Sequence, residues 1–459
     1  MSEGVIASYL LASIALGAIF KSKADTIKGF LVANREVRDW LLAFTFGATY
    51  FSSVVIVVGG AWAYMWGPVT LLIPLLNVVV GAFLAFIIVG RRITRLSLEL
   101  DALTVPELLA RIHGSRTLQR IFGIVTSVGL TLYAATVISA VSAMVGTVFH
   151  ADLRLAAFVI AAIMALYIAL GGMYSVVWTD ALQGVIMSSA IAVVALLALG
   201  RIGGLANLEH VEPLKPAPIT LIVDLALLTS VAVWGLPQLL NRFYTVASPG
   251  VVKRATGLAT FFAFIVSFGS FLTGLAAHKL VAGITPMKAV PILSLELLGG
   301  VGAAIFAAAV LAAAMSTADS IALTVASAFV YDVLGVRSTR VIRVASFLAM
   351  LAAATIAVIT LSLPKNLAEA VTAIFKTGWT LTAGAFLVPV LATLYDRKAS
   401  KTPILAASIA GMLASIFFGV AKALHVTLPT TIATLSFTIT VLVSLTAYVV
   451  ARIATMVSK

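Results

Sequence analysis

The chain has 459 residues, of which 62% are hydrophobic and only 10% are charged, and its mean hydropathy is +1.15. A soluble protein needs about 25% charged residues to cover its surface. The composition therefore excludes a soluble enzyme, a disordered protein and a nucleic-acid-binding protein. The net charge of +13 comes from basic residues in short loops between apolar runs. The absence of cysteine excludes disulfides and thiolate metal sites, and the sequence is that of a polytopic membrane protein.

Apolar runs of about 20 residues predict transmembrane helices, and the chain contains thirteen such runs. In chain order they are 4–20, 39–64, 67–91, 119–148, 152–170, 180–200, 219–243, 254–283, 299–334, 341–363, 367–395, 403–424 and 429–456. Long runs without polar alternation exclude a β-barrel. The first run follows Glu3 rather than a basic region, so we do not expect it to be a cleaved signal peptide.

The distribution of Lys and Arg predicts the orientation of the chain, because cytoplasmic loops carry an excess of both. With the N-terminus outside, 22 of these residues fall on the cytoplasmic side and seven on the outer side. The C-terminus then lies in the cytoplasm, and the expected location is the cell membrane.

Two of the predicted spans are interrupted by residues that disfavour a continuous helix. The first contains Ser52-Ser53, and the second contains Trp234-Gly235-Leu236-Pro237-Gln238. Each opens a block of five spans, 39–200 and 219–395, and an odd number of spans inverts one block relative to the other. Glycines in such spans can simply permit tight helix packing. Breaks at matching positions instead favour a midplane binding site, where unwound backbone offers free carbonyls and N–H groups.

Ionisable residues inside a span are costly and are functional candidates by default. They are Asp180, Asp224, Asp319, Asp332, Glu369 and Lys376. Asp224, Asp332 and Glu369 fall near predicted helix ends, which favours a solvated or capping role. Asp180 follows a polar hinge after Gly171-Gly172, where it or Thr179 could cap the next helix.

The run 299–334 is 36 residues long and would reach about 54 Å as a helix, so we expect it to tilt or to project from the membrane. Within it, Ser316-Thr317-Ala318-Asp319-Ser320 places four oxygen-bearing side chains in five residues. Oxygen is the ligand that a hard cation such as Na⁺ requires. Serine and threonine can instead bond to carbonyls one turn earlier, but that does not account for the aspartate.

Several motifs resemble, in order along the chain, those of the sodium:solute symporter family. Gly171-Gly172 with Trp178-Thr179-Asp180 and Gln183 is similar to the family signature, and 312–317 with Asp332 is similar to the eighth core helix. The segments 103–109 and 238–243 are similar to the loop after the second core helix and to the end of the sixth. The resemblance covers about residues 30 to 415. It implies a single transmembrane domain over 1–459 with a LeuT-type fold of two inverted repeats, 39–200 and 219–395, and two extra helices over 403–456.

The resemblance also implies which residues bind the coupling ion. The sodium site common to the family maps to backbone carbonyls of Ala48, Phe51 and Ala313 and to the hydroxyls of Ser316 and Thr317.

A second cation site of relatives similar to sialic acid symporters maps to Asp180, Ser316, Asp319 and Ser320. Asp319 stands where those relatives have a serine. This departure either strengthens cation binding or creates a site that binds a proton, since burial favours the neutral form of an acid.

The solute is expected at the first break and on the helices that face it. The candidate substrate residues are Ser52, Ser53, Tyr133, Trp234 and Lys376. Tyr50, Thr229 and Val233 differ from the residues that the resemblance leads us to expect in sodium/proline symporters, which counts against proline itself. Lys376 has two interpretations: it binds a substrate carboxylate, or it forms an ion pair with an acid such as Asp319 or Glu369.

The sequence as a whole predicts a sodium-coupled symporter that imports a small organic solute, carboxylate or amino-acid-like, by alternating access. Na⁺ is the coupling ion and no other cofactor or protein partner is expected. A proton-coupled symporter of the same fold and a transport-fold sensor are the alternatives. An enzyme is not expected, because the five histidines lie in or near loops without a paired set of carboxylates.

Overall fold

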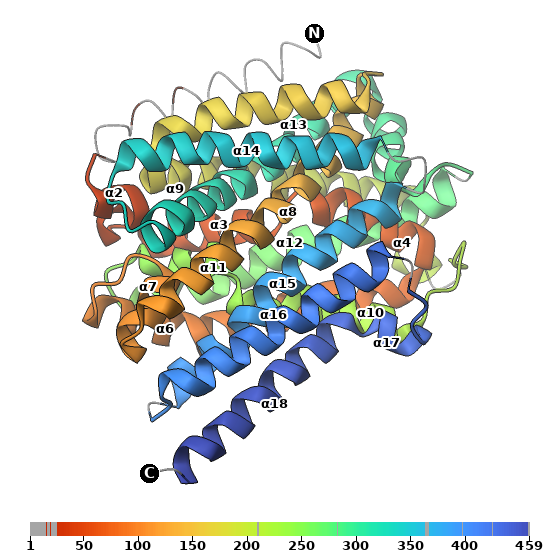
Figure 1. Cartoon of the computed structure of the whole chain (residues 1–459). Helices are drawn as coiled ribbons and strands as arrows, with labels where there is room; N and C mark the ends of the chain where they lie inside the picture. Colours follow the sequence, from red (N-terminus) through yellow and green to blue (C-terminus); the bar gives the residue numbers. More distant parts are fainter. Residues whose placement is uncertain are drawn as a thin grey trace.

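The structure, a computed structural model, describes residues 25–208, 211–281, 283–362, 367–396, 398–424 and 426–457, together with Ala15 and Ile19. These residues form helices and connecting turns and contain no strand. Figure 1 shows long helices running side by side between two edges, with α6 and α7 at one edge and α17 at the other. The all-helical membrane protein expected from the composition is confirmed.

The helices of the first half are α2 (Ile27–Val32), η2 (Ala33–Arg35), α3 (Asp39–Tyr50), η3 (Val54–Gly59), α4 (Gly60–Trp66), η4 (Pro68–Leu71), α5 (Leu72–Leu76), η5 (Asn77–Gly90), α6 (Arg91–Glu99), α7 (Val105–His113), α8 (Arg116–Val148), α9 (Leu153–Arg201) and η6 (Leu205–Leu208). Those of the second half are α10 (Ile219–Ser230), η7 (Val231–Gly235), α11 (Pro237–Leu240), η8 (Asn241–Tyr244), α12 (Pro249–Leu280), η9 (Pro286–Lys288), α13 (Ala289–Ser327), η10 (Ala328–Val333), α14 (Thr339–Leu361), α15 (Leu367–Tyr395), α16 (Lys401–Ala423), α17 (Thr430–Thr434) and α18 (Ser436–Val457).

The part of the chain that the structure describes contains nine helices long and apolar enough to cross a membrane, or up to eleven when each of two bent helix pairs counts as one span. The predicted count of thirteen is therefore not confirmed. The predicted run 4–20 lies outside the described residues. The predicted run 152–170 corresponds to a shorter apolar helix, Leu153–Ala162.

Both predicted interruptions are present as sharp bends. The first span turns by 55° between Asp39–Tyr50 and Val54–Trp66, and the second by 52° between Ile219–Gly235 and Pro237–Tyr244. Phe51 at the first bend and Leu236 at the second have extended backbone angles. The second bend has a direct cause, because Pro237 lacks the N–H that would continue the helix.

One predicted boundary is wrong. The polar stretch after Gly171 was expected to be a hinge before a span at 180–200, but the span runs over Gly172–Arg201. Gly172 makes the turn with φ 59°, a conformation that favours glycine. Asp180 therefore lies eight residues inside a helix and does not cap it. A similar turn at Gly299 (φ 66°) begins the long helix predicted over 299–334, which ends with η10.

The central helix α13 is packed tightly because its residues are small. It lies against α8, α9 and α3, and the alanines at 307–309 and 312–314 are all buried. Small side chains allow helix backbones in a membrane to approach closely. This packing brings the polar residues of α13 next to the first bend.

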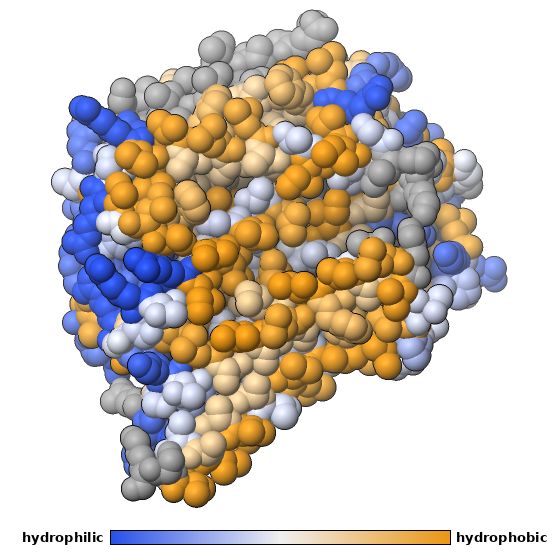
Figure 2. Space-filling model, viewed as in Figure 1, coloured by the Kyte–Doolittle hydropathy of each residue, from blue (hydrophilic) through white to orange (hydrophobic). Residues whose placement is uncertain are grey.

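The outer surface carries an apolar band. Figure 2 shows it between hydrophilic edges, the more continuous of which is the edge where Figure 1 places α6 and α7. Helix α6 begins with Arg91 and Arg92, so this edge belongs to the loops in which the sequence concentrates its basic residues. An apolar belt of this kind is what a lipid-facing surface requires.

Candidate functional site

The first bend exposes backbone groups at the centre of the molecule. The hydroxyl of Ser52 accepts a hydrogen bond from the N–H of Val54 at 3.1 Å and so caps the second half of the span. On the other side of the bend, the carbonyl of Ala48 accepts hydrogen bonds from side chains of α13 rather than from its own helix: Ser316 donates at 2.9 Å and Thr317 at 3.3 Å. The bend and α13 are thus joined through neutral oxygens.

The residues of the predicted sodium site lie together. Besides Ala48, the carbonyl of Ala313 is 3.1 Å from the Ser316 hydroxyl and 3.2 Å from the Thr317 hydroxyl. These four residues are fully buried, and Phe51, the fifth, lies at the bend.

These oxygens are of the kind that a hard cation prefers. Two oxygens about 2.4 Å from a hard cation, at right angles to each other, are about 3.4 Å apart. The observed separations of 2.9 to 3.3 Å are hydrogen-bond distances somewhat shorter than this value, and a hydroxyl can turn its lone pair toward an ion. Neutral oxygens suit a monovalent cation that must also leave.

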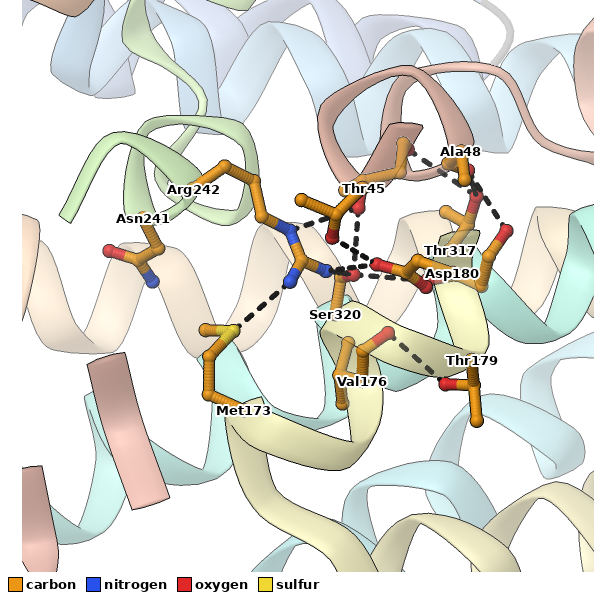
Figure 3. Close-up of polar contacts among 12 residues, drawn as sticks. Thr45, Ala48, Met173, Val176, Thr179, Asp180, Asn241, Arg242, Thr317 and Ser320 are labelled. Carbon is orange, nitrogen blue, oxygen red and sulfur yellow. Dashed lines mark hydrogen bonds and ion pairs between the residues drawn. The ribbon is translucent and has the colours of Figure 1, made fainter. Parts of the chain in front are cut away.

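The donors of the predicted second cation site contact a guanidinium instead. Arg242, at the end of the second bent span, is fully buried and lies 3.1 Å from the carboxylate of Asp180. It donates to the Thr49 hydroxyl at 3.0 Å and to the Ser320 hydroxyl, and it contacts the sulfur of Met173 at 3.0 Å. Figure 3 shows Arg242 pointing toward Asp180 and Ser320, with Met173 on its other side.

Two acids share this guanidinium. Asp180 also accepts a hydrogen bond of 2.5 Å from the Thr45 hydroxyl of α3. Asp319, fully buried on α13, interacts electrostatically with Arg242. The cluster connects both bent spans to α9 and α13 through these charges, and it places one cation against two carboxylates.

The position of Arg242 corrects an expectation from the sequence. It was counted among the 22 basic residues on the cytoplasmic side, although it stands inside the predicted run 219–243. The structure buries it completely within the second bent span, which ends at Tyr244. The signal that could have found it is its place directly after the broken segment, where an ionisable residue still belongs to the span.

A small cavity of about 30 Å³ lies beside the first bend, with room for about two waters. Its polar lining groups include Ser52, Tyr133, Asn77, Thr229 and Trp379. Ser52 and Tyr133 were predicted substrate residues, and their hydroxyls are 3.1 Å apart. Phe375 and Trp62 add aromatic surface that the sequence did not single out.

Three other predicted substrate residues lie elsewhere. The Ser53 hydroxyl donates to the carbonyl of Val137 at 2.9 Å, and the Trp234 indole donates to that of Val80 at 3.0 Å. Lys376 lines a different cavity.

The structure gives Lys376 a partner that the sequence did not indicate. Its ammonium lies 2.9 Å from Asp224 and donates to the carbonyl of Thr434 at 3.2 Å. Asp224 in turn accepts hydrogen bonds from the N–H groups of Phe437 and Thr438. Asp224 was expected to cap a helix or to be solvated. It does cap a helix end, but the N–H groups that it accepts from belong to the first turn of α18 and not to its own helix.

The remaining acids of the predicted spans differ from one another. Asp332 is buried and accepts hydrogen bonds of 2.8 Å from Thr104 and Gln119. Glu369 is largely exposed and pairs loosely with Lys215 at 3.9 Å.

A model of the sodium:solute symporter family matches residues 30–411. The chain belongs to the sodium:solute symporter family. Sodium-coupled solute transport is therefore its function, with Na⁺ and a solute as the species that it binds.

Curated relatives within this family agree. The osmoregulated proline transporter OpuE of Bacillus subtilis (strain 168) is 26% identical over 435 residues, covering 90% of this chain and 88% of the relative. The sodium/pantothenate symporter of Haemophilus influenzae is 23% identical, covering 71% and 70%. A sodium/proline symporter of Staphylococcus aureus is 24% identical, covering 72% and 67%.

Solved structures place this symporter in the expected LeuT-type class. A substrate-bound outward-open structure of a Na⁺-coupled sialic acid symporter superimposes with a TM-score of 0.79 at 17% identity, covering 98% of this chain and 97% of the other. Mhp1, a nucleobase-cation-symport-1 family transporter, superimposes in a closed conformation with a TM-score of 0.55 at 14% identity, covering 92% and 93%. The predicted fold class is confirmed.

Proposed function

We propose that this symporter imports a small zwitterionic or carboxylate solute together with one Na⁺, which binds between the first bend and α13. The ligands are the carbonyls of Ala48, Phe51 and Ala313 and the hydroxyls of Ser316 and Thr317. The observation that carries the proposal is the set of buried neutral oxygens that already join the bend to α13.

Coupling follows from which elements the cation joins. Na⁺ at this position holds the bent span against α13 and so orders the cavity wall formed by Tyr50 and Ser52 at the same bend. Ordering the wall raises the affinity for the solute, and the solute raises the affinity for Na⁺ by the same factor. Release of Na⁺ to the low cytoplasmic concentration frees the bent span and opens the path inward.

The cavity beside the first bend has room for only about two waters, so it must widen to admit a solute, and its lining limits which solute it can hold. Its described lining residues carry no charged side chain, so the charges of a solute must be met by Na⁺, hydroxyls and backbone. The half-helix that begins at Val54 presents its N-terminus at the bend, and helix N-termini favour anionic groups such as a carboxylate. Aromatic rings such as Phe375 and Trp379 suit an apolar body. Proline and pantothenate, which appear in the names of the relatives, both carry a carboxylate. They differ in size and are therefore useful test solutes.

One coupling cation is proposed rather than two, because Arg242 already makes the contacts that a second cation would need. Its guanidinium reaches both Asp180 and Ser320. Proton coupling remains the second candidate, and the observation that favours it is the second buried acid, Asp319. We also propose the orientation that the basic loops predict, with the N-terminus outside, the C-terminus in the cytoplasm and the chain in the cell membrane.

Uptake into proteoliposomes tests the proposal. Radiolabelled proline, other amino acids, monocarboxylates and pantothenate are each offered with an inward Na⁺ gradient, an inward H⁺ gradient, or neither. We expect uptake of one of them to require Na⁺, with a Hill coefficient of about 1. Ser316→Ala and Thr317→Ala should each raise the half-saturating Na⁺ concentration about tenfold, which corresponds to about 1.4 kcal/mol.

Ser346→Ala is the matched control, since this buried hydroxyl on α14 bonds only to the carbonyl of Ile342 in its own helix among the described contacts. Uptake driven by H⁺ without Na⁺, and lost in Asp319→Asn, would overturn the sodium site and leave the fold standing.

A further inference from the structure

A second cavity lies away from the proposed transport site, among α15, α16 and the segment that leads into α18. Its volume is about 370 Å³, which falls within the range of sites that hold small molecules. It opens where α16 ends and α18 begins, and it reaches inward as far as Thr380 near the middle of α15.

The charged residues among the described lining of this cavity are both basic. Lys376 and Lys422 both line it. Lys376 is paired with Asp224, but two N–H groups of α18 and the Thr438 hydroxyl already donate to that carboxylate. Lys422 makes no hydrogen bond or ion pair within the described residues. Two acids lie near these ammonium groups but neither lines the cavity: Asp224 is already heavily hydrogen-bonded, and Glu369, whose charge acts on Lys422, is exposed and 3.9 Å from Lys215. The described lining of the cavity therefore carries a net positive charge.

Two hydroxyls in the cavity wall are also available to a ligand. Thr380 on α15 and Ser415 on α16 are each only 3% exposed, and neither side-chain oxygen has a hydrogen-bond partner among the described residues. Both residues line the cavity. A buried polar atom without a partner is unfavourable, so these hydroxyls are ready to donate to an acceptor that enters.

The side chains around the cavity indicate which kind of molecule would bring the acceptor. Next to the cavity, Phe417 and Val420 of α16 and Leu424 beyond it are 55%, 48% and 71% exposed, and Val426, which lines it, is 52% exposed. Apolar side chains of this kind contact lipid. Lysines near helix ends extend toward the membrane interface. A cavity that holds two lysines and opens at the end of α16, beside lipid-facing side chains, is therefore within reach of lipid headgroups.

We propose that this cavity binds the phosphate of an anionic phospholipid, with Lys376 and Lys422 as the cationic partners and Thr380 and Ser415 as hydrogen-bond donors. The site joins α15 to the two C-terminal helices through the lipid. The lipid site is independent of the sodium and solute sites. A free phosphate ion could make the same contacts as the lipid phosphate, so the experiment must distinguish the two.

Binding to the full-length protein in detergent tests the site without any transport readout. The probes are dioctanoyl phosphatidylglycerol, dioctanoyl phosphatidylcholine and inorganic phosphate, measured by isothermal titration calorimetry. We expect phosphatidylglycerol to bind at least tenfold more tightly than phosphatidylcholine. Lys422→Gln should weaken phosphatidylglycerol binding about tenfold, the change expected for the loss of one charge-assisted hydrogen bond.

Lys288→Gln is the matched control, because Lys288 is an exposed lysine at the end of η9 and does not line the cavity. The double variant Thr380→Val/Ser415→Ala keeps both charges and should weaken binding as well. The proposal is overturned if Lys422→Gln binds phosphatidylglycerol as the wild type does. Equal affinity for inorganic phosphate, with competition between the two, would also overturn it by removing the lipid as the source.

Discussion

Replacing Arg242 by glutamine tests whether its guanidinium occupies the position of a second coupling cation. The change removes the ion pair with Asp180 and the hydrogen bonds to Thr49 and Ser320, and with them the positive charge that Asp180 and Asp319 share. All of these groups are buried. Removing one partner of a buried ion pair costs about 3–5 kcal/mol, and we expect the free energy of unfolding to fall by this amount in sodium-free buffer.

Sodium should restore part of the stability of this variant. Without the guanidinium, the oxygens of Asp180, Asp319 and Ser320 would surround an empty position. The two carboxylates would give that position a negative charge, and a cation can bind there. A ligand present at 100 times its dissociation constant stabilises the folded state by about 2.7 kcal/mol. Thermal unfolding of the purified protein, titrated with NaCl against choline chloride, measures this recovery. In uptake experiments the Hill coefficient for Na⁺ should rise from about 1 toward 2.

The matched control is Arg254→Gln, which removes an arginine that pairs with Asp39 but is 62% exposed. Exposed ion pairs contribute about 0–1 kcal/mol, so this variant should unfold near the wild-type temperature at every Na⁺ concentration. The reasoning is refuted if Arg242→Gln is as stable as the wild type in choline chloride. It is refuted equally if Na⁺ raises both unfolding temperatures by the same amount.

Three further changes test other parts of the structure. Hydrogen bonds, first of all from Arg452, lower the pKa of Asp396 to about 2. This pKa lies below the value of about 3.9 for aspartate in the unfolded chain. The ionised carboxylate therefore stabilises the fold at neutral pH, and this stabilisation is lost as the pH falls toward 2. Asp396→Asn should therefore lower the unfolding temperature at pH 7, with the difference shrinking below about pH 4. Gly274→Ala would push a methyl group into the backbone of Gly60, and this overpacking should lower the free energy of unfolding by about 1–3 kcal/mol. Lys376→Met breaks a nearly buried ion pair and should lower thermal stability while leaving the half-saturating solute concentration for uptake unchanged.

Each of these changes has its own check. Glu99→Gln alters an exposed acid and should show no pH-dependent difference from the wild type. Gly257→Ala, on the same helix as Gly274, adds a methyl group where no atom lies within 4 Å, so equal losses at both glycines would contradict the packing argument. For Lys376→Met, adding Asp224→Asn should recover stability, and a large loss of solute affinity would instead favour direct binding of a substrate carboxylate.

Local chemistry made much of the fold predictable. Ser52-Ser53 and Gly235-Leu236-Pro237 interrupt apolar runs, and both bends occur there. The hydroxyls of Ser316 and Thr317 were expected near Ala48 from the family resemblance, and they lie within hydrogen-bond distance of its carbonyl.

Charges were harder to place, because their location depends on partners that are distant in the sequence. Arg242 was counted with the cytoplasmic basic residues because it stands at the end of a predicted span, and only the folded chain brings Asp180 to it. Lys376 and Asp224 are 152 positions apart. The helix start at Gly172 was missed because polar residues after it suggested a loop, whereas they are buried between helices.

The bonding of Asp224 has a consequence for how the chain is completed in the membrane. Its carboxylate accepts hydrogen bonds from Lys376 on α15 and from Phe437 and Thr438 at the start of α18. During synthesis α10 enters the membrane long before either partner exists, and an acid without partners in lipid is strongly unfavourable. The last helix therefore completes the folding of a much earlier one, and a chain released before α18 is made would leave Asp224 without three of its four donors.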